Sequence, residues 1–213
     1  MIAAAARKRP GLASAGLALL LAACMLAACS QRRAQLPALG PDDVVLAFGD
    51  SITFGTGAGE GQSYPAMLEG LIGRKVVRSG VPGEVSAAGL ARLPSALEEH
   101  RPQFLILCHG GNDLLRNLGR KQAAENIRAM VRLATDRGLG VLLVAVPEPG
   151  LLPSPPDFYK DIAAEFGIPF EGEALTEILR DRSLKSDTVH PNAQGYARLA
   201  AALAGVLKKN GAI

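Results

Sequence analysis

The feature that most constrains the fold is an alternation of short, wholly apolar runs with longer amphipathic segments. Three runs of five or six residues carry no polar side chain, at 44–48, 104–108 and 141–146. Runs of this length are typical of strands buried on both faces, as in a parallel sheet. Between them, apolar residues recur at helical spacing, as at 64–72 before Gly73. Strand and helix therefore alternate along the chain.

This alternation predicts an α/β fold, a three-layer α/β/α sandwich around a mainly parallel sheet of five strands. Two weaker segments supply the remaining strands, at 75–78 and 168–170, and Pro169 favours a sheet edge for the second. Further helices are expected over 86–99, around 127–134, over 158–166 and along an apolar C-terminal stripe formed by Leu199, Leu203, Val206 and Leu207. The proline-rich segment 147–156 is expected to form a rigid, irregular loop.

The first 29 residues are typical of a targeting segment and are excluded from the fold. A basic cluster at 7–9 precedes an apolar run, which ends in Leu-Ala-Ala-Cys twice, at Cys24 and at Cys29. This pattern predicts a secretory signal peptide. The cysteine resembles that of a bacterial lipobox, where it receives lipid. Cys29 is preferred because polar residues follow it, although Cys24 gives a more usual apolar length; a plain cleaved signal or an uncleaved anchor is the alternative.

The domain organisation follows from these boundaries. Residues 1–29 form the predicted signal peptide with its lipobox, 30–43 a linker or tether, and 44–213 one domain. Neither candidate cysteine is followed by an aspartate that would signal inner-membrane retention. The expected location is therefore the bacterial envelope, as an outer-membrane lipoprotein that faces the periplasm and is held by its N-terminal lipid.

Charge and cysteine content narrow the function classes. Three of the 23 Lys and Arg residues lie in the targeting segment, which leaves 20 against 20 Asp and Glu, so the domain itself is formally neutral. This balance argues against a nucleic-acid partner. The domain holds a single cysteine, Cys108, and the chain has three histidines and no CxxC pair. We therefore expect no internal disulfide, no metal site and no cofactor.

Candidate chemistry lies where the apolar strands end, because ligands of such sheets bind beyond the carboxyl ends of the strands. Segments 49–51, 80–84 and 109–113 fall there, with the proline-rich loop beside them. Ser51 follows the first strand directly and could act as a nucleophile, although a serine at this position could also cap a helix.

A serine nucleophile needs a base and a group that orients the base. His100 ends a helix and is typical of a surface cation. His109 follows a buried strand and is a candidate for substrate contact. His190 stands before the last helix, three residues after Asp187, whose carboxylate could fold back onto the imidazole. A helix-capping aspartate beside an exposed histidine is the structural alternative.

Four short blocks, taken together, resemble the GDSL or SGNH hydrolase family. They are Gly49-Asp50-Ser51, the segment around Gly83, Gly110-Gly111-Asn112-Asp113, and the block from Asp187 to Asn192. They occur in the family's order and span the predicted domain. The resemblance implies the flavodoxin-like SGNH hydrolase fold and a serine hydrolase acting on ester bonds.

The resemblance also implies a role for each site residue. Ser51 is the nucleophile, His190 the general base and later the acid, and Asp187 the carboxylate that orients it. The backbone N–H groups of Ser51 and Gly83 and the amide of Asn112 form the oxyanion hole. Glu84, where related thioesterases often have Asp, and the Thr188-Val189 spacer depart from the usual pattern without removing a catalytic group.

Among the subfamilies, the chain is most similar to small bacterial arylesterases, thioesterase I and lysophospholipases. The expected substrate is a small acyl ester or a lipid, such as a lysophospholipid, an aryl ester or an acyl thioester. Leu151 and Leu152 could meet an acyl chain or simply pack their loop onto the domain. A polysaccharide or peptidoglycan O-deacetylase is the alternative enzyme. A non-catalytic envelope binding protein is the alternative outside the enzymes.

Overall fold

The sheet has five strands in the order β2-β1-β3-β4-β5, and every neighbouring pair is parallel. The computed structural model describes residues 36–213. The strands are β1 (Val44–Gly49), β2 (Lys75–Gly80), β3 (Phe104–Cys108), β4 (Gly140–Val144) and β5 (Phe170–Glu171). The helices are α2 (Ser51–Phe54), α3 (Tyr64–Ile72), α4 (Ser86–His100), α5 (Gly111–Leu115), α6 (Arg120–Thr135), α7 (Phe158–Phe166), α8 (Ala174–Arg180), the short 3₁₀ helix η1 (Arg182–Leu184) and α9 (Ala193–Lys209). The predicted α/β fold with five strands is confirmed.

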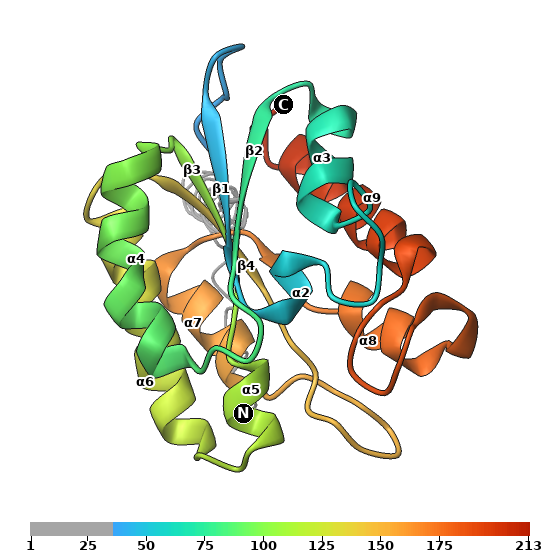
Figure 1. The fold of residues 1–213 in the computed structure, drawn as a ribbon. Helices are drawn as coiled ribbons and strands as arrows, with labels where there is room; N and C mark the ends of the chain where they lie inside the picture. Colours follow the sequence, from blue (N-terminus) through green and yellow to red (C-terminus); the bar gives the residue numbers. More distant parts are fainter. Residues whose placement is uncertain (1–35) are drawn as a thin grey trace, which may run out of the picture. The chain divides into compact units, whose positions relative to one another are not determined.

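Helices cover both faces of the sheet (Figure 1). Helix α3 packs with α9 and α8 with α9, while α4 packs with α6 and α6 with α7. The central strands are consequently shielded on both sides: Val45–Phe48 of β1 and all of β3 have no measurable exposure. Burial on both faces explains why these strands are apolar at every position rather than at alternate ones.

The helix ends follow local chemistry that is visible in the sequence. Helix α3 carries Pro65 in its first turn and ends at Gly73, whose φ of 61° is left-handed and whose N–H caps Glu69 O. Helix α4 runs to His100, which the sequence placed at a helix end. Helix α6 extends from Arg120, seven residues before the predicted start of its apolar stripe, and α8 was not predicted at all.

The fifth strand differs from the prediction. The sequence favoured 168–170, but the pairing covers only Phe170 and Glu171, which lie beside Leu143 and Val144. Pro169 lacks an N–H and contributes only its carbonyl, which accepts from Leu143 N at 3.1 Å. The edge position is as expected, and the strand is displaced toward the C-terminus because Pro169 cannot donate to the ladder.

The boundary of the domain also needs correction. The predicted tether ends at residue 43, yet Leu36 N donates to Asn210 O at 3.0 Å and Leu39 N to Ala212 O at 2.8 Å. Leu39 is buried in the core. The segment from 36 onward therefore belongs to the domain, pinned to its C-terminal end.

The predicted signal peptide, Cys24 and Cys29 lie outside the described residues. Across 36–213, no helix has the length and hydropathy needed to cross a membrane.

Candidate active site

Four segments meet at the carboxyl edge of the sheet. Ser51 begins α2 directly after β1, Gly83 lies in the turn after β2, and Asn112 is in the first turn of α5 after β3. His190 comes from the loop that precedes α9. This edge is where parallel sheets place their ligands, and it is the edge that the sequence singled out.

The turn that presents Ser51 is fixed by its neighbours on both sides. Asp50 caps α2, since its Oδ1 accepts from Ile52 N at 3.1 Å. A Cβ atom on Gly49 would lie 2.0 Å from the carbonyl oxygen of Cys108, so only glycine allows β1 and β3 to pass at this point. Ser51 therefore stands at the start of a helix whose entry is held by Asp50 and Gly49.

Ser51, His190 and Asp187 form one hydrogen-bonded series. The Oγ of Ser51 lies 2.9 Å from His190 Nε2, and His190 Nδ1 lies 2.7 Å from Asp187 Oδ2. The other carboxylate oxygen of Asp187 accepts from Val189 N at 2.8 Å and His190 N at 2.9 Å. Partial burial acts to raise the pKa of Asp187, but the hydrogen bonds from His190 and Val189 outweigh it and hold this pKa below its ordinary value.

The loop that carries His190 is closed by backbone pairing. Ser186 N donates to His190 O at 2.9 Å, and Asn192 N donates to Leu184 O at 2.9 Å. Asn192 also caps α9 by accepting from Gly195 N at 3.0 Å. These contacts hold the imidazole against Ser51, and the ionised Asp187 leaves the proton of the ring on Nδ1. Nε2 is then free to accept the serine proton.

Gly83 and Asn112 carry N–H groups and line the same cavity as Ser51. Gly83 adopts a φ of 77°, a left-handed conformation that favours glycine, and its carbonyl is held by Arg116 Nη2 at 2.9 Å. Its N–H has no hydrogen-bond acceptor within the described residues. The amide nitrogen of Asn112 donates to Asp50 Oδ2 at 3.2 Å, which leaves its second N–H for a ligand. Asn112, Gly83 and Ser51 all line one cavity.

Asp50 consequently has two roles, since it caps α2 and also accepts from the amide of Asn112. Asp50 is 2% exposed. Burial raises its pKa, and the hydrogen bonds from Ile52 and Asn112 oppose that rise. The buried Asp50 thus orients the amide of Asn112.

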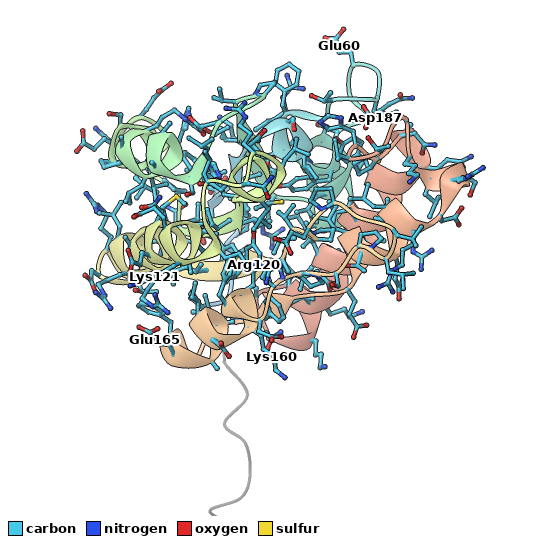
Figure 2. All side chains as sticks on the ribbon, turned by 90° about the horizontal axis from the view of Figure 1, so that it is seen from below. Glu60, Arg120, Lys121, Lys160, Glu165 and Asp187 are labelled. Carbon is cyan, nitrogen blue, oxygen red and sulfur yellow. The ribbon has the colours of Figure 1, made fainter. Side chains whose placement is uncertain are left out.

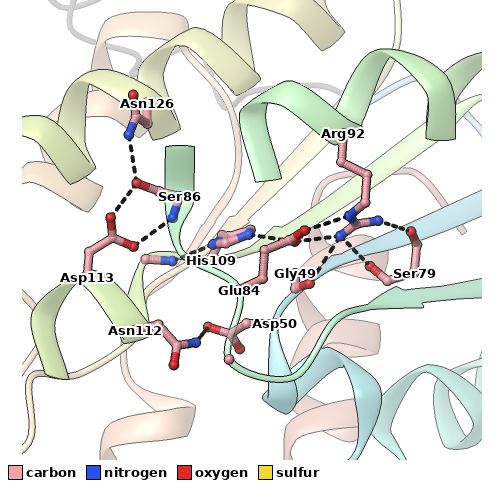
Figure 3. A network of polar contacts seen from close by, with 12 residues as sticks. Gly49, Asp50, Ser79, Glu84, Ser86, Arg92, His109, Asn112, Asp113 and Asn126 are labelled. Carbon is pink, nitrogen blue, oxygen red and sulfur yellow. Dashed lines mark hydrogen bonds and ion pairs between the residues drawn. The ribbon is translucent and has the colours of Figure 1, made fainter. Parts of the chain in front are cut away.

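His109 does not contact the cavity, contrary to the substrate contact expected for it. Its side chain is fully buried, and Figure 3 shows both ring nitrogens engaged. Nδ1 accepts from Gly110 N at 2.9 Å, so Nε2 carries the proton and donates to Glu84 Oε2 at 3.2 Å. A helix packed on the ring explains the burial: a Cβ on Gly89 of α4 would lie 2.3 Å from His109 Nε2.

Glu84 joins His109 to Arg92 in an extended polar network (Figure 3). Arg92 Nε and Nη2 bind the two carboxylate oxygens of Glu84 at 2.8 and 2.7 Å, and Nη1 donates to Ser79 Oγ at 2.7 Å. The guanidinium lies over the Phe48 ring, 4.0 Å from its centroid. Burial acts to raise the pKa of Glu84, but the hydrogen bonds from Arg92 and His109 lower it to about 2. The network thereby fixes Glu84, the residue that follows Gly83.

A second buried network positions α5. Asp113 accepts from Ser86 N and from Ser86 Oγ, both at 2.7 Å, and Asn126 Nδ2 donates to the same hydroxyl at 2.9 Å. These bonds tie α5 to α4 and α6 and thereby fix Asn112. The sequence analysis did not predict either network. The signal available in the sequence was a carboxylate in two of the family blocks, Glu84 beside Gly83 and Asp113 beside Asn112.

The site opens into a cavity of about 830 Å³. Its wall includes Ser51, His190, Gly83 and Asn112, together with apolar residues of the loop between β4 and α7. In that loop Leu151 is 98% exposed and Leu152 78% exposed, and both line the cavity. They therefore do not pack the loop onto the domain, which was the structural alternative to contact with an acyl chain. Within residues 36–213 no cluster of His, Cys, Asp or Glu is suited to a metal ion.

The hydrogen-bonded series of Ser51, His190 and Asp187 has the geometry that acyl transfer by a serine nucleophile needs. The sequence pattern of the GDSL-like Lipase/Acylhydrolase family matches residues 47–198. The chain belongs to this family of ester hydrolases, as the resemblance of its four blocks implied.

Curated relatives carry esterase names. The chain is 33% identical to Esterase TesA of Pseudomonas aeruginosa over 137 residues, which cover 62% of this chain and 65% of that protein. It is 28% identical over 158 residues to the Thioesterase 1/protease 1/lysophospholipase L1 of Escherichia coli K12, covering 70% of this chain and 76% of the relative. The chain thus spans about two thirds to three quarters of these two relatives.

Solved structures share the fold. A crystal structure of TesA superposes with a TM-score of 0.70 at 27% identity, covering 79% of this chain and 99% of the other. AlinE4, described as an SGNH-hydrolase family esterase, gives a TM-score of 0.61 at 30% identity, covering 81% of this chain and 98% of the other. The predicted SGNH hydrolase fold is confirmed.

Proposed function

We propose that this domain hydrolyses carboxylic ester or thioester bonds of acyl substrates, with Ser51, His190 and Asp187 as its catalytic residues. The observation that carries the proposal is the unbroken series from Asp187 through His190 to Ser51, with contacts of 2.7 and 2.9 Å, on the wall of a cavity. A structural serine would need no base aligned behind it.

The chemistry follows from the placement of the protons. As Ser51 Oγ attacks the ester carbonyl, its proton passes to His190 Nε2, and Asp187 stabilises the imidazolium that forms. The carbonyl oxygen becomes an oxyanion that accepts from the backbone N–H groups of Ser51 and Gly83 and from the amide of Asn112. Collapse breaks the bond to the alcohol or thiol, which leaves with the proton from His190. A water molecule then attacks the acyl-serine by the same route and releases the acid.

The apolar part of the cavity wall supports an acyl chain as the substrate group. Leu115, Leu151, Leu152, Leu179 and Val189 all line it. A cavity of about 830 Å³ is also in the range of pockets that enclose a molecule of drug size, about 300–1,000 Å³. Lysophospholipids, aryl esters and acyl thioesters fit this description, and the names of the thioesterase/lysophospholipase and esterase relatives agree with it. A deacetylase binds only a small acetyl group and would not need an apolar wall of this extent.

The proposal includes a place in the bacterial envelope. Residues 1–29 have the composition of a signal peptide, and Cys29, or else Cys24, stands where a lipoprotein receives its lipid. We propose an outer-membrane lipoprotein whose domain faces the periplasm, close to lipid substrates. Labelling with radioactive palmitate, lost in Cys29→Ala and retained in Cys24→Ala, would support Cys29 as the attachment point.

The function is tested by hydrolysis of p-nitrophenyl esters from acetate to palmitate, by wild type and Ser51→Ala. We expect activity with medium or long acyl chains that falls at least about 10³-fold in the variant. A sharp preference for acetate would favour the O-deacetylase. Equal inertness of the folded wild type and Ser51→Ala across the series would refute ester hydrolysis and favour a binding protein.

A further inference from the structure

One wall of the catalytic cavity carries three cationic side chains. Arg180 at the end of α8, Arg182 in η1 and Lys185 just beyond it all line the same cavity as Ser51 and His190. They come from a stretch of six residues directly before the catalytic loop. An ester hydrolase that binds only neutral acyl groups gains nothing from positive charge at this place, because neutral chains do not interact with it.

The two acidic residues that line the same cavity, Asp50 and Glu148, already have hydrogen-bond partners. Asp50 is buried and accepts from Ile52 and Asn112. Glu148 is bound by Arg120, whose Nε donates to its Oε1 at 2.9 Å. Figure 2 labels Arg120 near the middle of the domain seen from below, and Asp187 toward one side of it. The positive charge of the wall is therefore not neutralised from within the cavity.

Two of the three cations are anchored by backbone carbonyls rather than carboxylates. Arg180 Nε and Nη2 donate to Pro153 O at 3.1 and 2.8 Å, which ties α8 to the loop that carries Leu151 and Leu152. Lys185 Nζ donates to Leu179 O at 2.9 Å. Carbonyl anchors hold these side chains at the wall and leave their full charge in place.

Arg182 is the residue with free donors. Its guanidinium has no hydrogen-bond or ion-pair partner within residues 36–213. The neighbouring Asp181 does not supply one, since its Oδ1 accepts from Ser183 N at 2.9 Å and from Ser183 Oγ at 2.7 Å. A guanidinium with five N–H groups and a planar fork is the side chain best matched to a carboxylate or a phosphate.

We propose that this wall is a subsite for an anionic group of the substrate, a carboxylate or a phosphate, with Arg182 as its hydrogen-bond donor and Arg180 and Lys185 adding to the field. The inference rests on the proposed function and narrows its substrates to esters that carry a negative charge away from the scissile bond. The charge lies either at the far end of the acyl chain or on the alcohol, and the test separates the two.

The test compares two matched pairs of esters, using the purified full-length protein. The first pair is p-nitrophenyl butyrate and mono-p-nitrophenyl glutarate, which omit or add a carboxylate on the acyl side. The second pair is 1-palmitoyl glycerol and 1-palmitoyl lysophosphatidate, which omit or add a phosphate on the alcohol side. In one of the pairs we expect wild type to favour the anionic ester in kcat/KM by about fivefold, the ratio for one exposed charge-assisted contact.

Arg182→Gln removes the charge while keeping a polar side chain, and Arg182→Glu reverses it. The anionic-to-neutral ratio should fall about fivefold in the first variant and below one in the second, mainly through KM. Raising the salt concentration should erase the preference of wild type. Arg137→Gln, an exposed arginine whose Nη1 donates only to Leu133 O at 3.3 Å, is the matched control and should keep the wild-type ratio.

The outcomes separate this inference from the proposed function. If wild type hydrolyses both neutral esters and shows no preference in either pair, or if Arg182→Glu leaves the ratios unchanged, the subsite is refuted while ester hydrolysis stands. If no ester of either pair is hydrolysed and Ser51→Ala is indistinguishable from wild type, the proposed function itself fails. A preference confined to the glutarate or to the lysophosphatidate identifies which side of the ester carries the anion.

Discussion

Replacing Glu84 with glutamine tests whether the ion-pair network beside Gly83 stabilises the fold. The Glu84→Gln variant keeps the size of the side chain and one acceptor for Arg92, but it removes the charge. In wild type the carboxylate is 7% exposed and the guanidinium of Arg92 27% exposed. The pairing holds the pKa of Glu84 at about 2, against an ordinary value of 4.5.

That pKa sets both the size and the pH dependence of the effect. A shift of this size is worth at most about 3 kcal/mol of unfolding free energy, at 1.36 kcal/mol per pKa unit. Solvent access to Arg92 reduces the expected value to about 2 kcal/mol. Because the folded-state pKa is lowered, the contribution is complete above pH 4.5 and is lost as the pH falls toward 2.

The assay is urea unfolding of wild type and Glu84→Gln at pH 6 and pH 3. The difference between their unfolding free energies should be about 2 kcal/mol at pH 6 and less than about 1 kcal/mol at pH 3. Other carboxylates titrate alike in both proteins and cancel in the difference. Glu165→Gln breaks an exposed ion pair with Arg128 and should cost less than about 0.5 kcal/mol at either pH.

A difference that stayed constant between pH 6 and pH 3 would show that the charge of Glu84 does not stabilise the fold. A difference near zero at pH 6 would show that the cost of burying the pair cancels its attraction. Either result would refute the stabilising role assigned to the network.

Further predictions concern the catalytic groups and the cavity wall. Asn112→Ala should lower kcat about 10²–10³-fold, checked by steady-state kinetics on protein that calorimetry shows to be folded. Asp187→Asn should lower kcat by up to about 10⁴-fold because the amide favours the wrong tautomer of His190; a normal rate would exclude this role. Gly83→Ala places an L-residue at φ 77° and should cost about 1 kcal/mol in urea unfolding. Joint replacement of Leu151 and Leu152 by Ser should raise KM for long-chain esters and not for acetate, and equal effects on both would contradict acyl contact.

The order of strands and helices was predictable from the sequence because a strand buried on both faces is apolar at every position, and this pattern is visible in a short segment. Residues 44–48 and 104–108 are apolar at every position, and they became β1 and β3. The ends of α3 were equally local, set by Pro65 and Gly73. Strand β5 was predicted at 168–170 rather than at Phe170–Glu171, and helix α8 was not predicted, since two residues at a sheet edge and a seven-residue helix depend on packing against distant elements.

The features of the site likewise divide into those that short segments of the sequence indicate and those that only the tertiary structure decides. The spacing of Asp187 and His190, and the position of Ser51 directly after an apolar run, are properties of short segments, so the sequence alone determined these candidates. Only the tertiary structure brought His190 within 2.9 Å of Ser51, 139 residues away, and buried His109 against Glu84 and α4 instead of exposing it to substrate. Contacts between distant segments are set by how the helices pack on the sheet. That packing also decided that residues 36–43 belong to the domain and that Arg182 faces the cavity of Ser51.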